Sequence, residues 1–200
     1  MVEVTTLDPR DLPIAIAVLP GVARRAIEAH LAGVPMTLPE PRFPAYPVFV
    51  TLRERSGALR GCIGTLSPTQ ANALAETARS AVLAATQDPR FPKITRVELA
   101  NCAIEVSVLL PLEPVQGLGQ LDPYRYGVVV DDNEGRRGVL LPDLPGIETP
   151  EQQVAIARRK AGIAADALVS LSRFEVAKVS EDEATAQFLA AHPRGSDPTR

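Results

Sequence analysis

Apolar side chains alternate with other residues from Val48 to Arg53, and the same pattern resumes from Ala58 to Ile63. Alternation with a period of two is typical of a strand whose side chains point to opposite faces of a sheet. The intervening Glu54-Arg55-Ser56-Gly57 has the composition of a turn. The sequence therefore predicts a β-hairpin over residues 48–63, which commits the chain to a fold that contains antiparallel sheet.

Helical and strand patterns alternate around this hairpin. A helix is expected from near Leu19, a second from Ser67-Pro68 to Gln87, and a third over residues 149–161. Further strands are expected at 102–110, in a second hairpin over 127–141, and at 174–179, whereas the proline-rich residues 33–47 should be irregular. These elements predict an α/β (α+β) protein with no interdomain linker.

Charge and composition exclude several classes of protein. The 200 residues carry a formal charge of -3, and interspersed acidic and basic residues argue against binding to nucleic acid or to an anionic membrane surface. No apolar stretch approaches the ~20 residues of a bilayer helix, and the acidic start does not resemble a signal peptide. We therefore expect a cytoplasmic protein with no membrane partner, in which Cys62 and Cys102 are free thiols.

Cys62 is the first candidate for chemistry. Alternation should place Arg60 and Cys62 side by side on one face of their strand, with Leu59, Gly61 and Ile63 toward the core. A guanidinium beside a thiol favours the thiolate, so Cys62 is a candidate nucleophile assisted by Arg60. A buried structural cysteine is the equal alternative. Cys102 lies on an apolar face and is expected in the core.

Three other residues of this hairpin and its surroundings could serve a ligand. Gly61 and Gly64 would let a ligand or another backbone approach the sulfur, or would only permit a bulge. The prolines of Asp88-Pro89-Arg90-Phe91-Pro92 would hold Arg90 ready for a carboxylate or phosphate. The alternative is that Arg90 pairs with Asp88 while Phe91 fills the core.

Glu105 is the candidate base or anchor for this chemistry. It projects from the strand at 102–110 away from the apolar face, where it could take a proton or bind Arg60. A structural pair between Arg60 and Glu105 is the commoner arrangement. Neither histidine, His30 or His192, lies in a segment expected to reach Cys62.

Motifs for the common cofactors and metals are missing from the sequence. It contains no glycine-rich phosphate loop, no paired-cysteine zinc pattern, no His-Glu-x-x-His and no Gly-x-Ser-x-Gly. We therefore assign no metal ligand, and the cofactor is unknown.

The segment Leu59-Arg60-Gly61-Cys62-Ile63-Gly64, called the hexapeptide below, resembles the signature of the AMMECR domain family. Further segments resemble the family in the same order along the chain: Tyr46–Val50, Asp88–Pro92, Ile104–Leu109, Gly138–Pro142 and Lys160–Gly162. The resemblance covers residues 12–182 and leaves 183–200 as a polar C-terminal tail, expected to be partly disordered.

The resemblance implies a two-lobed single domain with an antiparallel sheet flanked by helices and a cleft beside the hexapeptide. Bacterial and archaeal relatives are known as component A of the AmmeMemoRadiSam system, which implies a Memo-type protein and a radical S-adenosylmethionine protein as partners. Relatives often have a histidine where this chain has Tyr126, so Tyr126 is a candidate proton donor or a packed side chain.

Two functions follow from these observations. The first is an enzyme or modifying factor that uses Cys62, with Arg60 and Glu105, on a small molecule or a protein side chain. The second is a non-catalytic binding or adaptor module that needs no base. A third, RNA binding, is opposed by the acidic charge and by the lack of aromatic stacking motifs.

Overall fold

The computed structural model describes residues 16–38 and 44–182, and the chain divides into two compact units. Unit 1 comprises residues 1–108 and 177–200, and unit 2 comprises residues 109–176. Each unit combines a four-stranded sheet with helices, so the predicted α+β class is confirmed. The expected C-terminal tail at 183–200 lies outside the described residues.

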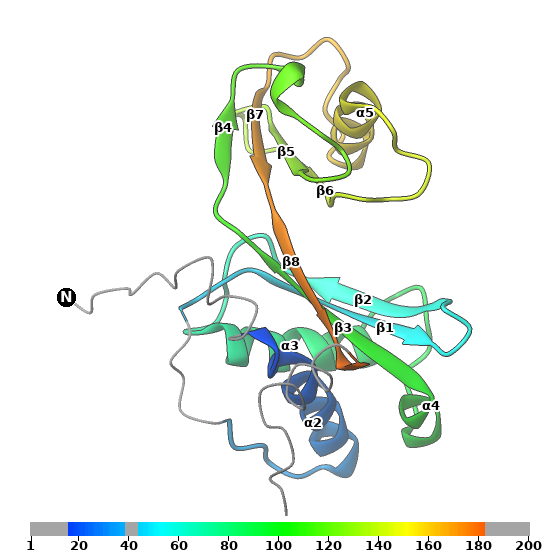
Figure 1. Cartoon of the computed structure of the whole chain (residues 1–200). Helices are drawn as coiled ribbons and strands as arrows, with labels where there is room; N and C mark the ends of the chain where they lie inside the picture. Colours follow the sequence, from blue (N-terminus) through cyan, green and yellow to red (C-terminus); the bar gives the residue numbers. More distant parts are fainter. Residues whose placement is uncertain (1–15, 39–43, 183–200) are drawn as a thin grey trace, which may run out of the picture. The chain divides into compact units, whose positions relative to one another are not determined.

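The sheet of unit 1 has the strand order β2-β1-β3-β8, in which β1 pairs antiparallel with both β2 and β3 (Figure 1). Its elements in chain order are α2 (Leu19–Ala32), β1 (Val48–Glu54), β2 (Leu59–Gly64), α3 (Ala73–Thr86), α4 (Arg96–Ala100), β3 (Cys102–Leu109) and β8 (Val176–Ser180). The predicted hairpin is therefore confirmed as β1 and β2, with β2 at the edge of the sheet.

One face of this sheet forms the core of unit 1. Val50 lies opposite Val106, and Leu52 lies opposite Ile104, and none of these four side chains is exposed to solvent. Helix α3 packs on β1 and β2, and α2 packs on α3, so both helices lie on the same side of the sheet (Figure 1). The alternation in β1 and β3 therefore specified this face correctly.

Helix α3 begins six residues after Ser67, so the predicted helix start was wrong. Its N-cap is Asn72, whose side chain accepts a hydrogen bond from the Ala75 amide. The buried carboxylate of Glu76 accepts hydrogen bonds from the Thr65 hydroxyl and from the Thr69 and Gln70 amides, each at 2.7 Å. These bonds hold the segment after β2 in an irregular conformation, so the helix begins only at Ala73.

Unit 2 contains the strand order β4-β7-β5-β6 with antiparallel pairing throughout. Its elements are β4 (Glu113–Val115), the short helix η1 (Leu118–Gln120), β5 (Gly127–Asp131), β6 (Arg137–Leu140), α5 (Pro150–Lys160) and β7 (Ser170–Phe174). Helix α5 packs on β5 and β6, and a Cβ atom at Gly138 would lie 2.0 Å from the carbonyl oxygen of Ala157. The second hairpin and the third helix are thus confirmed.

The last predicted strand is divided between the two sheets. β7 pairs with β4 and β5, whereas β8 lies beside β3 in the other sheet, with Glu175 between the two strands. The carbonyl oxygen of Glu175 accepts a hydrogen bond from the Leu110 amide. A local pattern of side chains predicts a strand but does not identify the strand that pairs with it. The sequence pattern therefore could not predict that this strand divides between two sheets.

Candidate functional site

The hexapeptide forms the edge strand β2, and the loop at residues 88–92 covers its outer side. The amide of Cys62 donates to the Asp88 carboxylate at 2.9 Å, and Arg90 Nη2 approaches the carbonyl oxygen of Cys62 at 3.4 Å. Arg90 also binds Asp88 through Nε and Nη2, at 2.9 and 2.7 Å. An ion pair therefore takes the place of a neighbouring strand and fixes the peptide groups of Cys62.

Asp88 is ionised in this arrangement. Its side chain is 2 % exposed. The hydrogen bonds from the Arg90 side chain hold the pKa of the Asp88 carboxyl far below its usual range. Burial opposes this effect, and the hydrogen bonds from the amides of Cys62 and Arg90 reinforce it. The same pair raises the pKa of the Arg90 guanidinium. Arg90 thus pairs with Asp88, which is the alternative to the predicted carboxylate or phosphate site.

The sulfur of Cys62 lies on the half-buried surface of β2, beside the middle strand of the sheet. Thr51 lies opposite Cys62 in the register, and its hydroxyl donates to Sγ at 3.3 Å. Cys102 is a second free thiol, and burial raises its pKa. Both cysteines are free as expected, and Cys62 is the more accessible of the two.

Glu105 does not lie next to Cys62. Thr51 of β1 pairs with Cys62 on one side and with Glu105 on the other, so the three residues form a row across β2, β1 and β3. Two strand spacings of about 4.8 Å separate the outer members of such a row. A direct role of Glu105 as base for Cys62 required neighbouring strands, but β1 lies between them and makes Thr51 the neighbour of the sulfur.

Arg60 lies at an irregularity in the hairpin. Leu52 pairs with Gly61 and Arg53 pairs with Leu59, so Arg60 is the extra residue of a β-bulge. Its side chain is 7 % exposed and donates to the Pro92 carbonyl at 3.0 Å and to Glu98 at 3.1 Å. The expected pair with Glu105 was therefore wrong, because the bulge aims the guanidinium at α4.

The bulge also changes which hexapeptide residues face the core. Leu59 lies opposite the exposed Arg53 and is only half-buried, although strict alternation predicted a core position. Because the extra residue at position 60 interrupts the alternation, only the part of β2 beyond the bulge keeps the predicted faces.

The glycines of the hexapeptide serve close packing of the chain on itself. A Cβ atom at Gly61 would lie 2.4 Å from the carbonyl oxygen of Ala84 in α3, and one at Gly64 would lie 2.4 Å from the carbonyl oxygen of Val48. The predicted close approach therefore occurs, and the approaching groups are a helix and the neighbouring strand.

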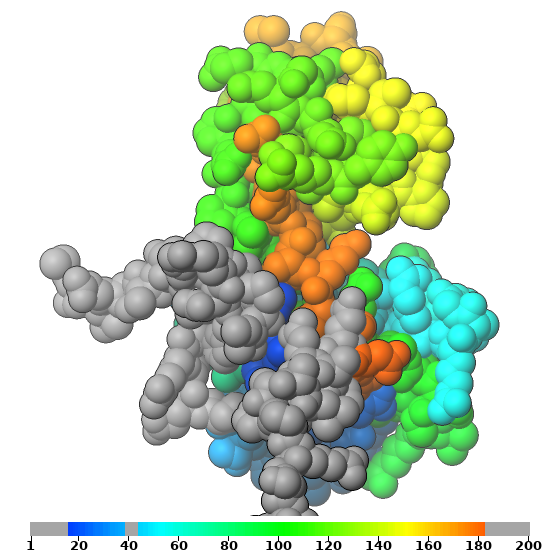
Figure 2. All heavy atoms as spheres, in the orientation of Figure 1, coloured from blue at the N-terminus to red at the C-terminus, as the bar shows by residue number. Residues whose placement is uncertain are grey.

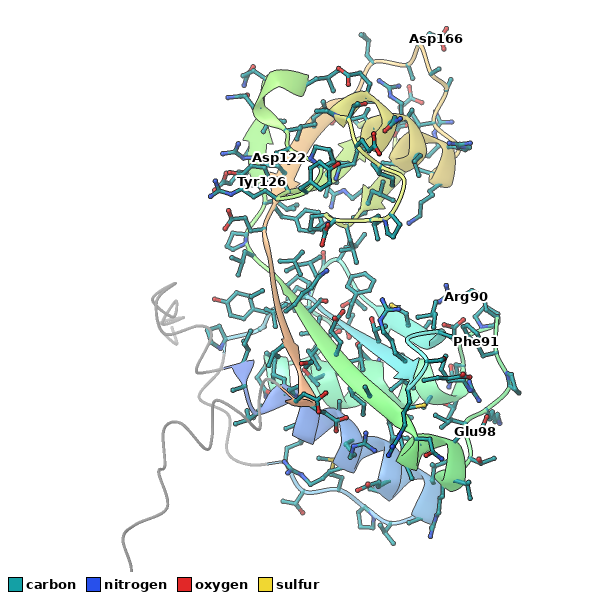
Figure 3. All side chains as sticks on the ribbon, turned by 45° about the vertical axis from the view of Figure 1, so that its right-hand side comes forward. Arg90, Phe91, Glu98, Asp122, Tyr126 and Asp166 are labelled. Carbon is teal, nitrogen blue, oxygen red and sulfur yellow. The ribbon has the colours of Figure 1, made fainter. Side chains whose placement is uncertain are left out.

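The aromatic ring of Phe91 lies close to two guanidinium groups, with its centroid 5.8 Å from the Arg60 carbon and 5.5 Å from the Arg90 carbon. Figure 3 shows Arg90, Phe91 and Glu98 along one edge of unit 1. Cation–π attraction and ion pairing thus join the loop and α4 to the hexapeptide.

Tyr126 belongs to unit 2. The guanidinium carbons of Arg125 and Arg173 lie 4.9 and 4.2 Å from the centroid of its ring, and the carbonyl oxygen of Tyr126 accepts a hydrogen bond from Gln153. Figure 3 places it near Asp122. These contacts support packing of the ring against two cations, and its role as a proton donor stays a prediction.

Three contacts at this site were missed from the sequence. The capping box of Thr95 with Glu98 is a recognisable signal for α4, whereas the contacts of Thr51 with Cys62 and of Asp88 with the Cys62 amide depend on register and loop path.

Among residues 16–38 and 44–182, no group of at least three His, Cys, Asp or Glu side chains could hold a metal ion. None of the helices in that part of the chain is long and apolar enough to cross a membrane.

Comparison with known proteins identifies the family. The AMMECR1 family model matches residues 20–179. The chain belongs to the AMMECR1 family. This agrees with the resemblance of the hexapeptide and of the segments that follow it.

The most similar AMMECR1 relatives include proteins from bacteria and archaea. A protein of Thermotoga maritima is 49 % identical over 129 residues, covering 64 % of this chain and 74 % of its own length. Protein CA_C1420 of Clostridium acetobutylicum is 39 % identical over 67 % of this chain, and the match spans only 28 % of that relative. Uncharacterized protein PH0010 of Pyrococcus horikoshii has a crystal structure that matches with a TM-score of 0.72 at 31 % identity, covering 82 % of this chain and 90 % of that one.

Proposed function

We propose that this AMMECR1-family protein is a cysteine-dependent enzyme or modifying factor, in which Cys62 is the nucleophile toward a small molecule or a protein side chain. The observation that carries the proposal is the environment of the sulfur. The peptide of Cys62 is fixed by Asp88 and Arg90, and the Thr51 hydroxyl donates a hydrogen bond to Sγ at 3.3 Å.

These contacts suit a thiolate. A hydroxyl that donates to sulfur stabilises a negative charge there, and the guanidinium of Arg90 lies 3.4 Å from the carbonyl oxygen of Cys62. A fixed backbone also holds the nucleophile in one orientation, which lowers the entropic barrier to attack. Arg90 therefore takes the role predicted for Arg60, that of the cation beside the thiolate.

The covalent step needs no redox partner. The Cys62 thiol releases its proton to solvent, the sulfur bonds to an electrophilic carbon of the substrate, and the leaving group departs with the bonding electron pair. Thr51 remains a hydrogen-bond donor to sulfur until the bond has formed. Glu105 lies on β3, and β1 separates it from Cys62, so its action as a base requires the Thr51 hydroxyl between them.

The test compares alkylation of the two cysteines in the full-length chain. Wild-type protein is treated with iodoacetamide at neutral pH, and the modified peptides are quantified by mass spectrometry. Cys62 should react at least tenfold faster than Cys102, and Thr51→Val should slow Cys62 severalfold while leaving the melting temperature unchanged. An equal rate in wild type and Thr51→Val would contradict the activated thiol.

The second candidate function is a non-catalytic binding module, which is favoured by one observation. Among the described residues, the hydrogen bond to the Cys62 sulfur comes from a threonine rather than from a histidine or carboxylate base. Incubating wild type, Cys62→Ser and Cys102→Ser with native cell extract separates the two functions. A covalent mass increase that disappears only in Cys62→Ser supports the enzyme, and partner capture that is unaffected by Cys62→Ser supports the module.

We also propose a setting and partners for this activity. Free thiols at both cysteines are consistent with a reducing cytoplasm. The resemblance to component A of the AmmeMemoRadiSam system suggests a Memo-type protein and a radical S-adenosylmethionine protein as partners. Co-purification of either protein with the tagged chain from its native host would support this assignment, and repeated capture of neither would count against it.

A further inference from the structure

A cavity of about 310 Å³ lies in unit 1 between the turn that joins β1 to β2, helix α4 and the start of β3. Arg55 and Ser56 line it from the turn, and Val97 and Asn101 line it from the region of α4. Its wall also includes Arg60, Cys102 and the acidic side chains of Glu54 and Glu98. In Figure 2 the β1 and β2 hairpin, in cyan, lies at the surface beside the green atoms of α4. Cys62 is not among the lining residues.

Arg60, which lines this cavity, has an unsatisfied donor. Its Nε and Nη2 donate to Glu98, and Nη2 also donates to the Pro92 carbonyl, but Nη1 is buried without a hydrogen-bond partner. A buried cationic donor without an acceptor is unfavourable, and such groups are rare in folded proteins. An acceptor supplied by a ligand would complete the hydrogen bonding of the guanidinium.

The neighbouring acidic side chains restrict the charge of that ligand. Glu98 cannot supply the missing acceptor, since one oxygen already binds Arg60 and the other accepts from Thr95. The Glu54 carboxylate accepts from the Ser56 hydroxyl at 3.4 Å. The charges of Arg55 and Arg60 offset those of Glu54 and Glu98. A dianion such as phosphate would therefore add two uncompensated negative charges and a carboxylate only one, so the smaller charge is favoured.

We propose that this cavity binds a small monocarboxylate. One carboxylate oxygen accepts a hydrogen bond from Arg60 Nη1, and the hydrocarbon part of the ligand packs against Val97 and Cys102. Because Nη1 is shielded from solvent, entry of the ligand requires a small shift of neighbouring side chains. Val97, which also lines the cavity, is 76 % exposed, so few contacts hold its side chain in place.

This site is separate from the one proposed for Cys62. Arg60 belongs to the bulged part of β2 and bonds with α4, whereas Cys62 is held by Asp88, Arg90 and Thr51. The carboxylate site therefore requires no reactive thiol. Cys62→Ser should leave carboxylate binding unchanged, so failure of either proposal is distinguishable from failure of the other.

The test is a titration of the full-length, isotope-labelled protein with 4-methylpentanoate, followed by amide chemical shifts. Saturable shifts are expected at Val97 and Asn101 and at the Arg60 side chain. 4-Methylpentanamide should bind about tenfold more weakly because a charge-assisted hydrogen bond becomes a neutral one. Absence of saturable shifts with 4-methylpentanoate, or equal binding of the amide, would overturn the proposal, as would stronger binding of inorganic phosphate.

Two variants keep the test independent of folding. Arg60→Lys retains the charge and removes the Nη1 donor, and it should weaken binding about tenfold. Val97→Trp fills the mouth of the cavity from an exposed position and should abolish the shifts without lowering the melting temperature. Leu168→Trp, at a position in unit 2 that is 92 % exposed, is the matched control and should bind like wild type. Undiminished binding in Val97→Trp would show that the ligand occupies another site.

Discussion

Removal of the Asp88 carboxylate tests how the hexapeptide is held. In wild type this group accepts hydrogen bonds from the amides of Cys62 and Arg90, at 2.9 and 3.1 Å, and from two nitrogens of the Arg90 side chain. Bonds from the amides to a buried charge contribute about 1.5 kcal/mol each. The half-exposed Arg90 side chain adds about 0.5 kcal/mol after solvent screening. Asp88→Ala should therefore lose about 3.5 kcal/mol of stability in unit 1.

The dependence on pH gives a second readout for Asp88. The folded pKa of this carboxyl lies below its unfolded value of about 3.9, so its stabilisation is present above that value and is lost as pH falls through the folded pKa. The difference in stability between wild type and Asp88→Ala should be full at neutral pH and should narrow in acid.

Urea unfolding followed by circular dichroism measures the loss, and hydrogen exchange of the Cys62 amide localises it. Exchange of this amide should accelerate in Asp88→Ala, because its acceptor is gone. Asp166→Ala, at an exposed position in unit 2, is the control and should change stability by less than about 0.5 kcal/mol. A wild-type stability in Asp88→Ala, or a difference that stays constant into acid, would refute the role of this ion pair.

Two further substitutions test the packing around the hexapeptide. Gly61→Ala should destabilise unit 1 by about 1–3 kcal/mol, because the new Cβ would lie 2.4 Å from the Ala84 carbonyl oxygen. Urea unfolding measures this loss. An unchanged free energy of unfolding would show that α3 can move away. Glu76→Gln should lose about 2 kcal/mol, because an amide group cannot accept all the bonds that Thr65, Thr69 and Gln70 donate. Burial opposes ionisation of Glu76, yet those hydrogen bonds lower its pKa overall. The loss in Glu76→Gln should therefore shrink in acid, and an equal loss at every pH would contradict this account.

Local patterns accounted for most of the secondary structure. The alternation in β1 and β3 specified both the strands and their buried face, because a side chain's side of a strand depends only on its position along the chain. The capping box of Thr95 and Glu98 carried a signal for α4 that was not used. The start of α3 was misplaced because Ser67-Pro68 is a good local cap, and the decisive acceptor, Glu76, acts across a loop.

The chain by itself thus determined its family, its α+β class and the identity of the thiol at position 62. Only the tertiary structure decided which groups meet that thiol. The order β2-β1-β3 placed Thr51 between Cys62 and Glu105, and the bulge turned Arg60 toward Glu98. Strand order and register arise from contacts between residues far apart in sequence, so no local periodicity encodes them.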